Sequence, residues 1–573
     1  MPTRALLLAA VIALIAAALY APARNFGLVW DDPVVLQQQL PRLDSWRLAF
    51  FPPTDIPELA PVYYRPLVIV SYLVDQRLVN TAPPARTFHL TTVLWHALAC
   101  LALFGFARRL ALALAFTERR ATSLAAAVAL LFATAPIHVD AVAAITGRAD
   151  VMATAFVCFA AWSYLVRLQR GGAVRLALSI VCLLAALLSK ETGIAAIPLL
   201  LWLDIALGDD AAVTSRFRRW LVLAVPLVLY VLLRALALHG MAQSASANSL
   251  SSIEAQPWAV LPALGWYLRN LAWPLPQSPF VPSAGGVVLG VVGALAAAAL
   301  LALLWRAWRR GHNAPEAVGI VLLLAALVPA LCVPLMGVTY LPVAERYLYL
   351  PSAGALIAMV LFGARRLPRA AALMVVLLVA ALGSWQTVVH QTVWRDPLAL
   401  WTAARDSAPT HHIPYAMLGR ELAALQRYSE AESSYRRGIE LAIDGKARAA
   451  LRNNLGSLQR RRGGAQADAA AYETFRAAIA DDPRHWPALY NLALTALSLA
   501  RSVSPVQQAP LLDEAVDALM RAKAVAPGNL DLRLLLARAL AAAGHREEAR
   551  REASELIALA PSSAQAREVR VLQ

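Results

Sequence analysis

The sequence of 573 residues contains few charged residues, only 15% of the total, against 59% hydrophobic ones. The shortage is concentrated in about the first 390 residues, where apolar runs close to twenty residues long recur. A mean hydropathy of +0.56 excludes a soluble globular fold for this part of the chain. Apolar runs of this length are instead typical of helices that span a bilayer.

Cysteine is also rare, and neither β-strand patterns nor a nucleotide-binding loop is evident. The four cysteines lie inside apolar runs without metal-ligand spacing, which excludes a disulfide scaffold and a cysteine-based metal site. We expect them to be small packing residues. No glycine-rich phosphate loop follows a strand, so a nucleotide-sugar site is excluded. The four residues are Cys100, Cys158, Cys182 and Cys332.

The formal net charge of +16 could indicate nucleic-acid binding, but the placement of the arginines argues against it. Arginine clusters fill short gaps between apolar runs, as the positive-inside rule predicts for cytoplasmic loops. The remaining gaps between apolar runs hold acidic residues, basic residues and histidines together, which is typical of an active site. We therefore predict no nucleic-acid partner. The clusters are Arg108/Arg109 with Arg119/Arg120, Arg167/Arg170/Arg175, Arg216/Arg218/Arg219, Arg306/Arg309/Arg310 and Arg365/Arg366/Arg369.

The apolar runs predict an all-α, polytopic membrane bundle of eleven spans over residues 1–395. With the N-terminus inside, all five arginine clusters fall inside, and an odd number of spans places the C-terminal region outside. We expect the first span to be retained, with a cleaved signal peptide as the alternative. The approximate limits are 5–21, 87–107, 121–137, 149–166, 174–189, 192–207, 220–238, 285–305, 316–337, 347–364 and 370–389.

Two predicted outer loops are long, at about 22–86 and 239–284. In the first loop, the stretch from Pro33 to Phe51 predicts a short interfacial helix. In the second loop, Trp258 to Trp273 forms an amphipathic segment. Interfacial packing explains both segments, and a cover over a lipid-facing cavity is compatible with it.

Residues 396–573 differ in composition, because alanine, arginine and glutamate recur there at helical spacing with internal repeats. We identify about four repeats, the clearest from Leu530 to Pro561. The pattern resembles the tetratricopeptide repeat, a helix–turn–helix unit that stacks into an α-solenoid with a concave binding face. Small residues that let the paired helices approach include Gly419 and Gly456.

The first outer loop carries two adjacent carboxylates, Asp31 and Asp32, directly after Trp30. Two such groups beside a membrane surface repel each other and would titrate as a pair. A carboxylate placed there can accept a proton from a hydroxyl group, which contributes ~10²–10⁴-fold in rate. Asp32 followed by Pro33 is equally compatible with a helix N-cap. We therefore favour Asp31 as the base.

Further polar residues lie beside the outer ends of the spans. Arg65 could pair with the aspartates, hold a phosphate by its planar fork, or snorkel at the interface. Lys190 and Glu191 could neutralise each other in a tight turn, or Lys190 could contact a phosphate. Arg346 is a second phosphate candidate, and His138 is equally compatible with a polar cap. The full set of candidates for binding the substrate or carrier is Arg65, His138, Asp140, Arg148, Asp150, Lys190, Glu191, Arg234, Glu345 and Arg346.

Several short motifs occur in an order that is similar to a known family. They include Val29-Trp30-Asp31-Asp32, Tyr64-Arg65-Pro66-Leu67, Pro136-Ile137-His138-Val139-Asp140, Gly147-Arg148-Ala149-Asp150, Ser189-Lys190-Glu191 and Glu345-Arg346-Tyr347-Leu348-Tyr349-Leu350-Pro351. With the attached repeats, they resemble the transmembrane and tetratricopeptide repeat-containing O-mannosyltransferases and their bacterial relatives.

The resemblance implies a GT-C glycosyltransferase fold and an inverting transfer of a sugar, mannose or another hexose. The donor would be a polyprenyl-phosphate carrier and the acceptor a Ser/Thr hydroxyl of an exported protein bound by the repeats. An acidic residue of the first outer loop would be the base, which carries over to Asp31 or Asp32. Arg65, Lys190 and Arg346 would hold the carrier phosphate. This chain differs in having only about four repeats.

Two other functions remain open from the sequence: a non-catalytic membrane scaffold for envelope assembly, and a GT-C enzyme with a lipid or glycan acceptor. No residue spacing demands a metal, although a divalent metal is compatible with the polar set. The composition fits a bacterial inner membrane, with the candidate site and the repeats on the periplasmic side.

Overall fold

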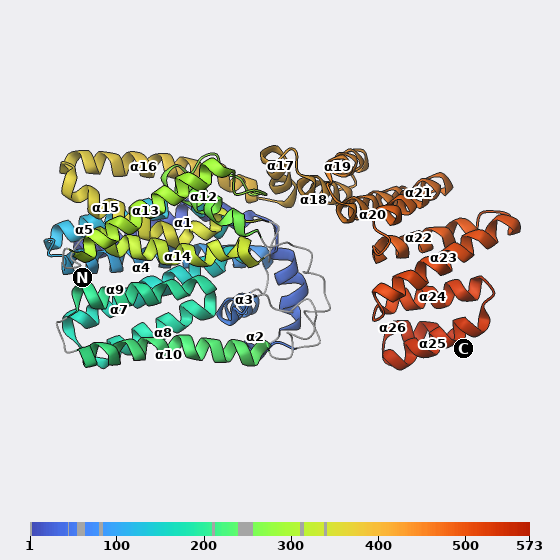
Figure 1. Ribbon diagram of the computed structural model, residues 1–573, viewed down its shortest axis with the longest axis horizontal. Helices are drawn as coiled ribbons and strands as arrows, with labels where there is room; N and C mark the ends of the chain where they lie inside the picture. Colours follow the sequence, from blue (N-terminus) through green and yellow to red (C-terminus); the bar gives the residue numbers. More distant parts are fainter. Residues whose placement is uncertain are drawn as a thin grey trace. The chain divides into compact units, whose positions relative to one another are not determined.

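The computed structural model describes residues 3–43, 45–53, 63–78, 84–208, 213–238, 256–309, 315–336 and 341–572. Within these ranges every regular element is a helix (Figure 1), which confirms the all-α prediction. The chain separates into two compact units, Met1–Ala403 and Ala404–Gln573. We call them the membrane unit and the repeat unit.

Eight helices of the described part of the membrane unit are long and apolar enough to cross a bilayer. A ninth candidate is a bent pair, in which α5 (Glu118–Ala133) meets the segment Pro136–Ala143 at 55°. The helices α8 (Ala173–Ser189) and α9 (Ala196–Leu207) coincide with two further predicted spans. At 17 and 12 residues, they are shorter than each of the eight long helices. A count of eleven spans therefore stays a prediction. The eight are α1 (Thr3–Tyr20), α4 (Pro84–Ala113), α7 (Arg148–Arg170), α10 (Val213–Leu238), α13 (Val287–Arg309), α14 (Pro315–Met336), α15 (Tyr349–Arg366) and α16 (Arg369–His390).

The burial of the long helices separates a core from a periphery. In α4 and α7, 67% of the apolar window is buried, whereas in α13 and α16 only 11% is. An apolar helix that is exposed all round is stable only in contact with lipid or with further protein. In the core, α14 and α15 approach closely because a Cβ added at Gly319 would lie 2.5 Å from the carbonyl oxygen of Gly354. Such small-residue contacts are typical of packed membrane helices.

Contacts gather the predicted inner loops at one end of the membrane unit. Arg109 donates a hydrogen bond to Gln169 at 3.0 Å, and Arg219 donates one to Asp204 at 2.9 Å. Arg120 donates to the carbonyl oxygen of Ala364. The other polar set gathers where α7 begins, so the two sets lie at opposite ends of α7. The structure thus separates the two sets as the charge pattern predicts, except that Arg310 lies outside the described residues.

The predicted interfacial helix from Pro33 to Phe51 is wrong as a single helix. The segment consists of a π-helix (Val34–Gln39), a 3-10 turn (Leu40–Arg42) and the short helix α2 (Trp46–Phe50). Pro41 explains the break, because proline has no N–H to donate within a helix. In the second loop, α12 (Val260–Ala272) confirms that the amphipathic segment is helical; residues 239–255 of that loop lie outside the described ones.

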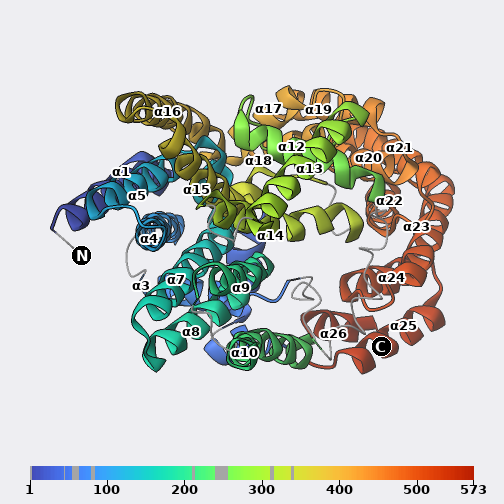
Figure 2. The ribbon, with the colours of Figure 1, turned by 60° about the vertical axis from the view of Figure 1, so that its left-hand side comes forward.

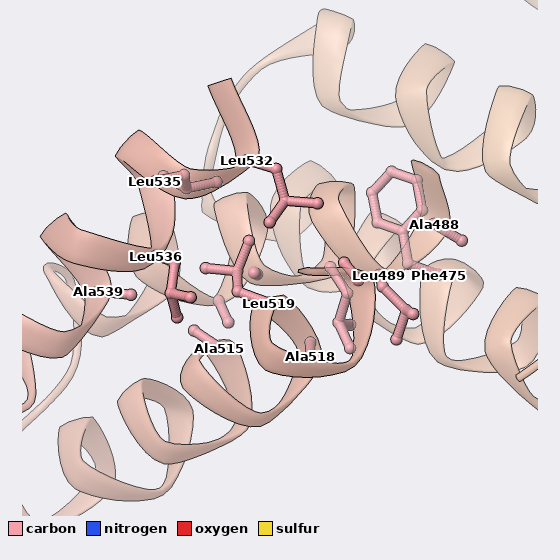
Figure 3. Close-up of a cluster of buried hydrophobic side chains, with 14 of the residues drawn as sticks. Phe475, Ala488, Leu489, Ala515, Ala518, Leu519, Leu532, Leu535, Leu536 and Ala539 are labelled. Atoms are coloured by element: carbon pink, nitrogen blue, oxygen red, sulfur yellow. The ribbon is translucent and has the colours of Figure 1, made fainter. Parts of the chain in front are cut away.

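The described part of the repeat unit contains four successive helix pairs, as expected of an α-solenoid, while the number of tetratricopeptide repeats stays a prediction. Their first helices lie on one side of the stack and their second helices on the other (Figure 2). A Cβ on Gly456 would lie 2.6 Å from the ring of Phe475, and Gly419 faces Tyr435 in the same way. Leu489, Leu519 and Leu536 fill the space between neighbouring pairs (Figure 3). The pairs are α18 (His412–Ala424) with α19 (Tyr428–Leu441), α20 (Gly445–Arg462) with α21 (Ala465–Asp481), α22 (Trp486–Ala500) with α23 (Pro505–Val525), and α24 (Leu530–Ala542) with α25 (Arg546–Leu559).

Candidate active site

The two adjacent carboxylates occupy different environments. Asp32 is fully buried, and its carboxylate accepts hydrogen bonds from the backbone N–H groups of Val29 (3.2 Å), Ile145 (3.4 Å) and Thr146 (2.8 Å). The N-cap interpretation of Asp32 is therefore wrong, because these N–H groups belong to the preceding Val29 and to the 3-10 turn Ile145–Gly147 before α7, not to the helix that follows Asp32. Burial raises the pKa of Asp32 to about 6, although the three N–H groups favour its charged form. Asp32 fastens the first outer loop to the helix bundle.

Asp31 is exposed, in contrast to its neighbour. Its charge acts on the guanidinium of Arg346, which also interacts with Asp140 and Asp150. Asp31 is thus the accessible member of the doublet, and it lies at the same end of the membrane unit as the polar residues of the other predicted outer loops.

Arg65 lies just before α3 (Pro66–Leu78) and contacts the turn between α8 and α9. Its Nη2 and Nε atoms donate to the same oxygen of Glu191, at 2.8 and 3.2 Å. The Arg65 guanidinium also stacks over the ring of Tyr63, 4.2 Å from its centroid. On the other side of Glu191, Nη1 of Arg234 lies 3.8 Å from its second oxygen. Glu191 therefore sits between two arginines that are far apart in the sequence.

Lys190 and Glu191 do not neutralise each other, so that interpretation of the turn is wrong. Nζ of Lys190 instead lies 2.5 Å from Oδ2 of Asp150, and both side chains are at least 94% buried. Burial lowers the pKa of Lys190, and Asp150 opposes this effect only in part. Burial raises the pKa of Glu191, but the charge and hydrogen bonds of Arg65, a backbone hydrogen bond and the charge of Lys190 together lower it below the ordinary value.

A second ion pair joins α6 (Val139–Ala143) to the start of α15. Oδ2 of Asp140 accepts a hydrogen bond from the backbone N–H of Arg346 at 3.1 Å. The other oxygen of Asp140 lies 3.9 Å from Nη1 of Arg346, beyond hydrogen-bonding distance. Arg346 keeps 21% of its side chain exposed, so its guanidinium is accessible from the surface.

These pairs form one connected network. The charge of Lys190 interacts with both Arg65 and Arg346, and that of Asp150 reaches Arg65. The ring of Tyr347 lies 5.0 Å from Nζ of Lys190 and 5.7 Å from the guanidinium of Arg346. The structure thus brings together seven of the residues singled out in the sequence as binding candidates, and places Asp31 beside them. The seven are Arg65, Asp140, Asp150, Lys190, Glu191, Arg234 and Arg346.

Glu345 braces the second outer loop beside this network. It is buried, and Oε1 accepts a hydrogen bond from the backbone N–H of Ser278 at 3.0 Å. Gln277, the preceding residue, donates to the carbonyl oxygen of Pro136 at 2.5 Å. Nε2 of His390, at the end of α16, lies 3.9 Å from Glu345. Glu345 therefore joins the second loop to α15 and α16.

His138 and Arg148 make their contacts elsewhere. Nε2 of His138 lies 2.8 Å from the hydroxyl of Ser352, and its ring packs against Tyr349 with 4.4 Å between centroids. Arg148 is fully buried, pairs with Asp75 at 2.6 Å and stacks on Tyr72. Both side chains thus join helices within the bundle.

The structure also shows residues that the sequence did not single out. Asp75 holds Arg148, Gln277 and Ser278 hold the second loop, and Trp401 stacks on Trp30. None of these belongs to a recognisable motif, and their partners lie 67 to 371 residues away, so no local signal identifies them. Within the described ranges, no three His, Cys, Asp or Glu side chains are grouped closely enough to hold a metal ion.

Comparison with known proteins shows partial similarity to protein O-mannosyl-transferases. Mouse TMTC1 is 36% identical over 141 residues, covering 23% of this chain and 14% of that protein. Mouse TMTC3 is 31% identical over 101 residues, covering 18% and 10%. The chain therefore matches only a small part of the length of these curated relatives. No family model matches the chain.

Among solved structures, the chain shows similarity to two proteins, each aligned over about 30% of this chain. YrrB, described as a TPR protein with an unusual peptide-binding site, aligns with a TM-score of 0.24 and 18% identity, covering 30% of this chain and 81% of that one. MamA aligns with a TM-score of 0.24 and 20% identity, covering 29% and 83%. The partial similarity to TMTC1 and TMTC3 relates a segment of this chain to TMTC-type proteins.

Proposed function

We propose that this multi-pass membrane protein is a glycosyltransferase that moves a hexose from a polyprenyl-phosphate carrier to a Ser/Thr hydroxyl of an exported protein. The observation that carries the proposal is the convergence of Arg65, Lys190 and Arg346 beside the exposed carboxylate of Asp31. A cationic cluster at the end of an apolar bundle suits a ligand with a charged head group and a lipid tail. The partial homology to protein O-mannosyl-transferases supports the same class of reaction.

In this mechanism Asp31 accepts the proton of the acceptor hydroxyl, whose oxygen attacks the anomeric carbon of the donor sugar. The bond from that carbon to the phosphate oxygen breaks, and the polyprenyl phosphate leaves with the bonding electrons. Attack from the face opposite the leaving group inverts the anomeric centre. The protein then needs mainly to position the two substrates and to neutralise the leaving phosphate.

The ion pairs of the network suit the leaving phosphate to different degrees. Arg346 approaches Asp140 through its side chain only at 3.9 Å, so a phosphate oxygen can compete for the guanidinium. Arg65 is bound more tightly, with two donors on Glu191. We assign the main phosphate contact to Arg346, with Arg65 and Lys190 contributing their charge.

The proposed acceptor is a polypeptide held by the repeat unit. Stacked helix pairs of this kind present an extended surface for a partner chain. In the setting expected from the sequence, a bacterial inner membrane, this surface and the network would both face the periplasm.

Mass spectrometry of exported proteins from cells with and without the chain tests this proposal. We expect a hexose on Ser or Thr residues that is lost without the chain, and lost again with Asp31→Asn. Removal of a general base lowers the rate by about 10²–10⁴-fold. Arg346→Ala should raise the donor concentration needed for half-maximal transfer in isolated membranes. Glu118→Gln, at an exposed carboxylate that pairs with Arg108 at the arginine-rich end of the membrane unit, serves as the control.

Three results would contradict the proposal. Transfer that persists in an expressed Asp31→Asn variant would remove Asp31 from its role as base. Unchanged exported proteins together with an altered lipid-linked glycan would instead assign a lipid or glycan acceptor. If neither exported proteins nor glycans change, the protein is a non-catalytic scaffold.

A further inference from the structure

The turn that carries Asp31 is held by residues from the C-terminal part of the membrane unit. Trp30 stacks on Trp401 of α17 (Pro397–Ser407), with 5.0 Å between ring centroids and 20° between ring planes. The backbone N–H of Gly27 donates to the carbonyl oxygen of Arg395 at 2.8 Å. Trp401 is only 4% exposed, so the stack is shielded from solvent. Residues about 370 positions apart therefore meet directly before Asp31.

The backbone at Trp30 is in an unusual conformation. Its φ angle is +55°, in the left-handed region that large side chains rarely adopt. Such a conformation is unfavourable for a large side chain and persists only where the surroundings enforce it. Since Asp31 follows immediately, relaxation of Trp30 to a negative φ would redirect the Asp31 carboxylate.

Asp31 is also fixed from its other side. The next residue, Asp32, is fastened to the backbone N–H groups of Ile145 and Thr146. An exposed carboxylate that would otherwise move freely thus lies between two buried anchors, the Trp30–Trp401 stack and the Asp32 hydrogen bonds. This arrangement is what a base requires if it must remain at a defined distance from a bound hydroxyl.

We infer that Trp401 is a positioning residue for Asp31: its ring holds Trp30 in the left-handed conformation and thereby aims the Asp31 carboxylate. This inference rests on the proposed function, in which Asp31 is the base. Trp401 itself touches neither substrate nor reacting atoms in this role. Its contribution is expected in the rate of transfer rather than in the binding of the donor.

The test uses the full-length chain in membranes, with undecaprenyl-phosphate mannose as donor and the exported-protein fraction of cells lacking the chain as acceptor. The variants are Trp401→Ala, Trp401→Phe and Leu400→Ala. Leu400 is the matched control, because it lies in the same helix and is fully buried but takes no part in the stack. Hydrogen exchange of the Gly27 and Asp32 amides, measured on the purified chain, reports the state of the turn without activity.

We expect Trp401→Ala to lower the rate at saturating donor by about tenfold to a hundredfold, as for a misplacement of about 1 Å. The half-saturating donor concentration should stay within about twofold, the two amides should exchange faster, and Trp401→Phe should recover most of the rate. A wild-type rate in Trp401→Ala, unchanged exchange at the turn, or an equal loss in Leu400→Ala would each overturn the inference. Activity that survives Asp31→Asn would refute the proposed base, while the exchange measurement would still decide whether Trp401 holds the turn.

Discussion

At the scale of single residues, two identical side chains next to each other have opposite roles because their surroundings differ. Asp32 loses its hydration and gains three backbone N–H donors, whereas Asp31 remains exposed. A buried carboxylate that is satisfied by backbone groups is expensive to alter. The doublet therefore combines an anchor with an accessible carboxylate.

The anchor role of Asp32 predicts a dependence of stability on pH. Its pKa of about 6 in the folded protein lies above the ordinary value of 3.8, so the folded state retains the proton more tightly between these values. Stability should fall as pH rises from about 4 to 6, by roughly 3 kcal/mol from this group. Thermal unfolding of the wild type and of Asp32→Asn across this range measures the effect.

The Asp32→Asn variant has no carboxyl group to titrate at this position. Its unfolding temperature should therefore fall less than that of the wild type as pH rises from about 4 to 6. Above about pH 6 the variant should make fewer hydrogen bonds at this site than the charged wild-type carboxylate, because an amide nitrogen cannot accept from one of the three N–H donors. If the unfolding temperatures of the two proteins fall equally between pH 4 and 6, Asp32 is not the group that causes the loss of stability.

The sequence could indicate the doublet but could not separate its members. The neighbours that bury Asp32 come from Ile145 and Thr146, more than a hundred residues later. Local rules favoured a helix cap at Asp32 because Pro33 follows it, and tertiary contacts overrode that preference. By the same reasoning, the predicted ion pair between Lys190 and Glu191 is wrong, since Lys190 pairs with Asp150 and Glu191 with Arg65.

At the scale of helices, most of the fold follows from periodicity and run length. Each predicted span coincides with a helix, because an apolar run of this length is stable in a bilayer only if its backbone groups bond within the segment. The predictions of helix limits are wrong where the backbone geometry of proline, rather than hydrophobicity, determines where a helix ends. Pro41 divides the predicted interfacial helix, and the break between Ala133 and Pro136 bends a predicted span by 55°.

In the repeat unit, the pairing of a small residue with an aromatic ring makes a quantitative prediction. Gly456→Ala places a methyl group 2.6 Å from the Phe475 ring and should destabilise the α20–α21 pair by about 1–3 kcal/mol. Hydrogen exchange of the amides in these two helices, measured in the full chain, gives the local opening free energy.

Gly528→Ala is the matched control, since a Cβ at Gly528 meets no atom within 4 Å. Its effect should stay below about 1 kcal/mol. Combining Gly456→Ala with Phe475→Leu should recover part of the lost protection. Equal protection in Gly456→Ala and the wild type would mean that the ring moves aside without cost, and the small-to-large pairing would then not explain the repeat pattern.

At the scale of the whole molecule, function depends on which helices cross the membrane. Eight crossings would place the two termini on the same side, whereas nine or eleven would place them on opposite sides. Because α8 and α9 form a hairpin, they cross together or not at all and leave this outcome unchanged. The sidedness of the repeat unit therefore depends on α5.

Contacts at both ends of α5 favour a crossing. Near its start, Thr122 accepts a hydrogen bond from Arg108 at 3.1 Å, within the arginine-rich end of the membrane unit. Just beyond its end, the carbonyl oxygen of Pro136 accepts from Gln277, beside Glu345 and the ion-pair network. The bent segment thus runs from one end of the unit to the other. With α5 counted, we predict that the N-terminus and the segment after α16 face opposite sides of the membrane.

Cysteine labelling tests this sidedness directly. In a chain whose four cysteines are replaced by alanine, Gln37→Cys and Lys446→Cys should react with a membrane-impermeant maleimide added outside, and Arg170→Cys only after permeabilisation. All three positions are exposed in the structure, so the reagent's access is decided by the membrane alone. Labelling of position 37 without position 446 would place the repeats across the bilayer from Asp31, and a repeat-bound acceptor could not reach the proposed base. The proposed transfer therefore requires these two positions to respond alike, since no rearrangement within either unit could bring a hydroxyl and a carboxylate together through the bilayer.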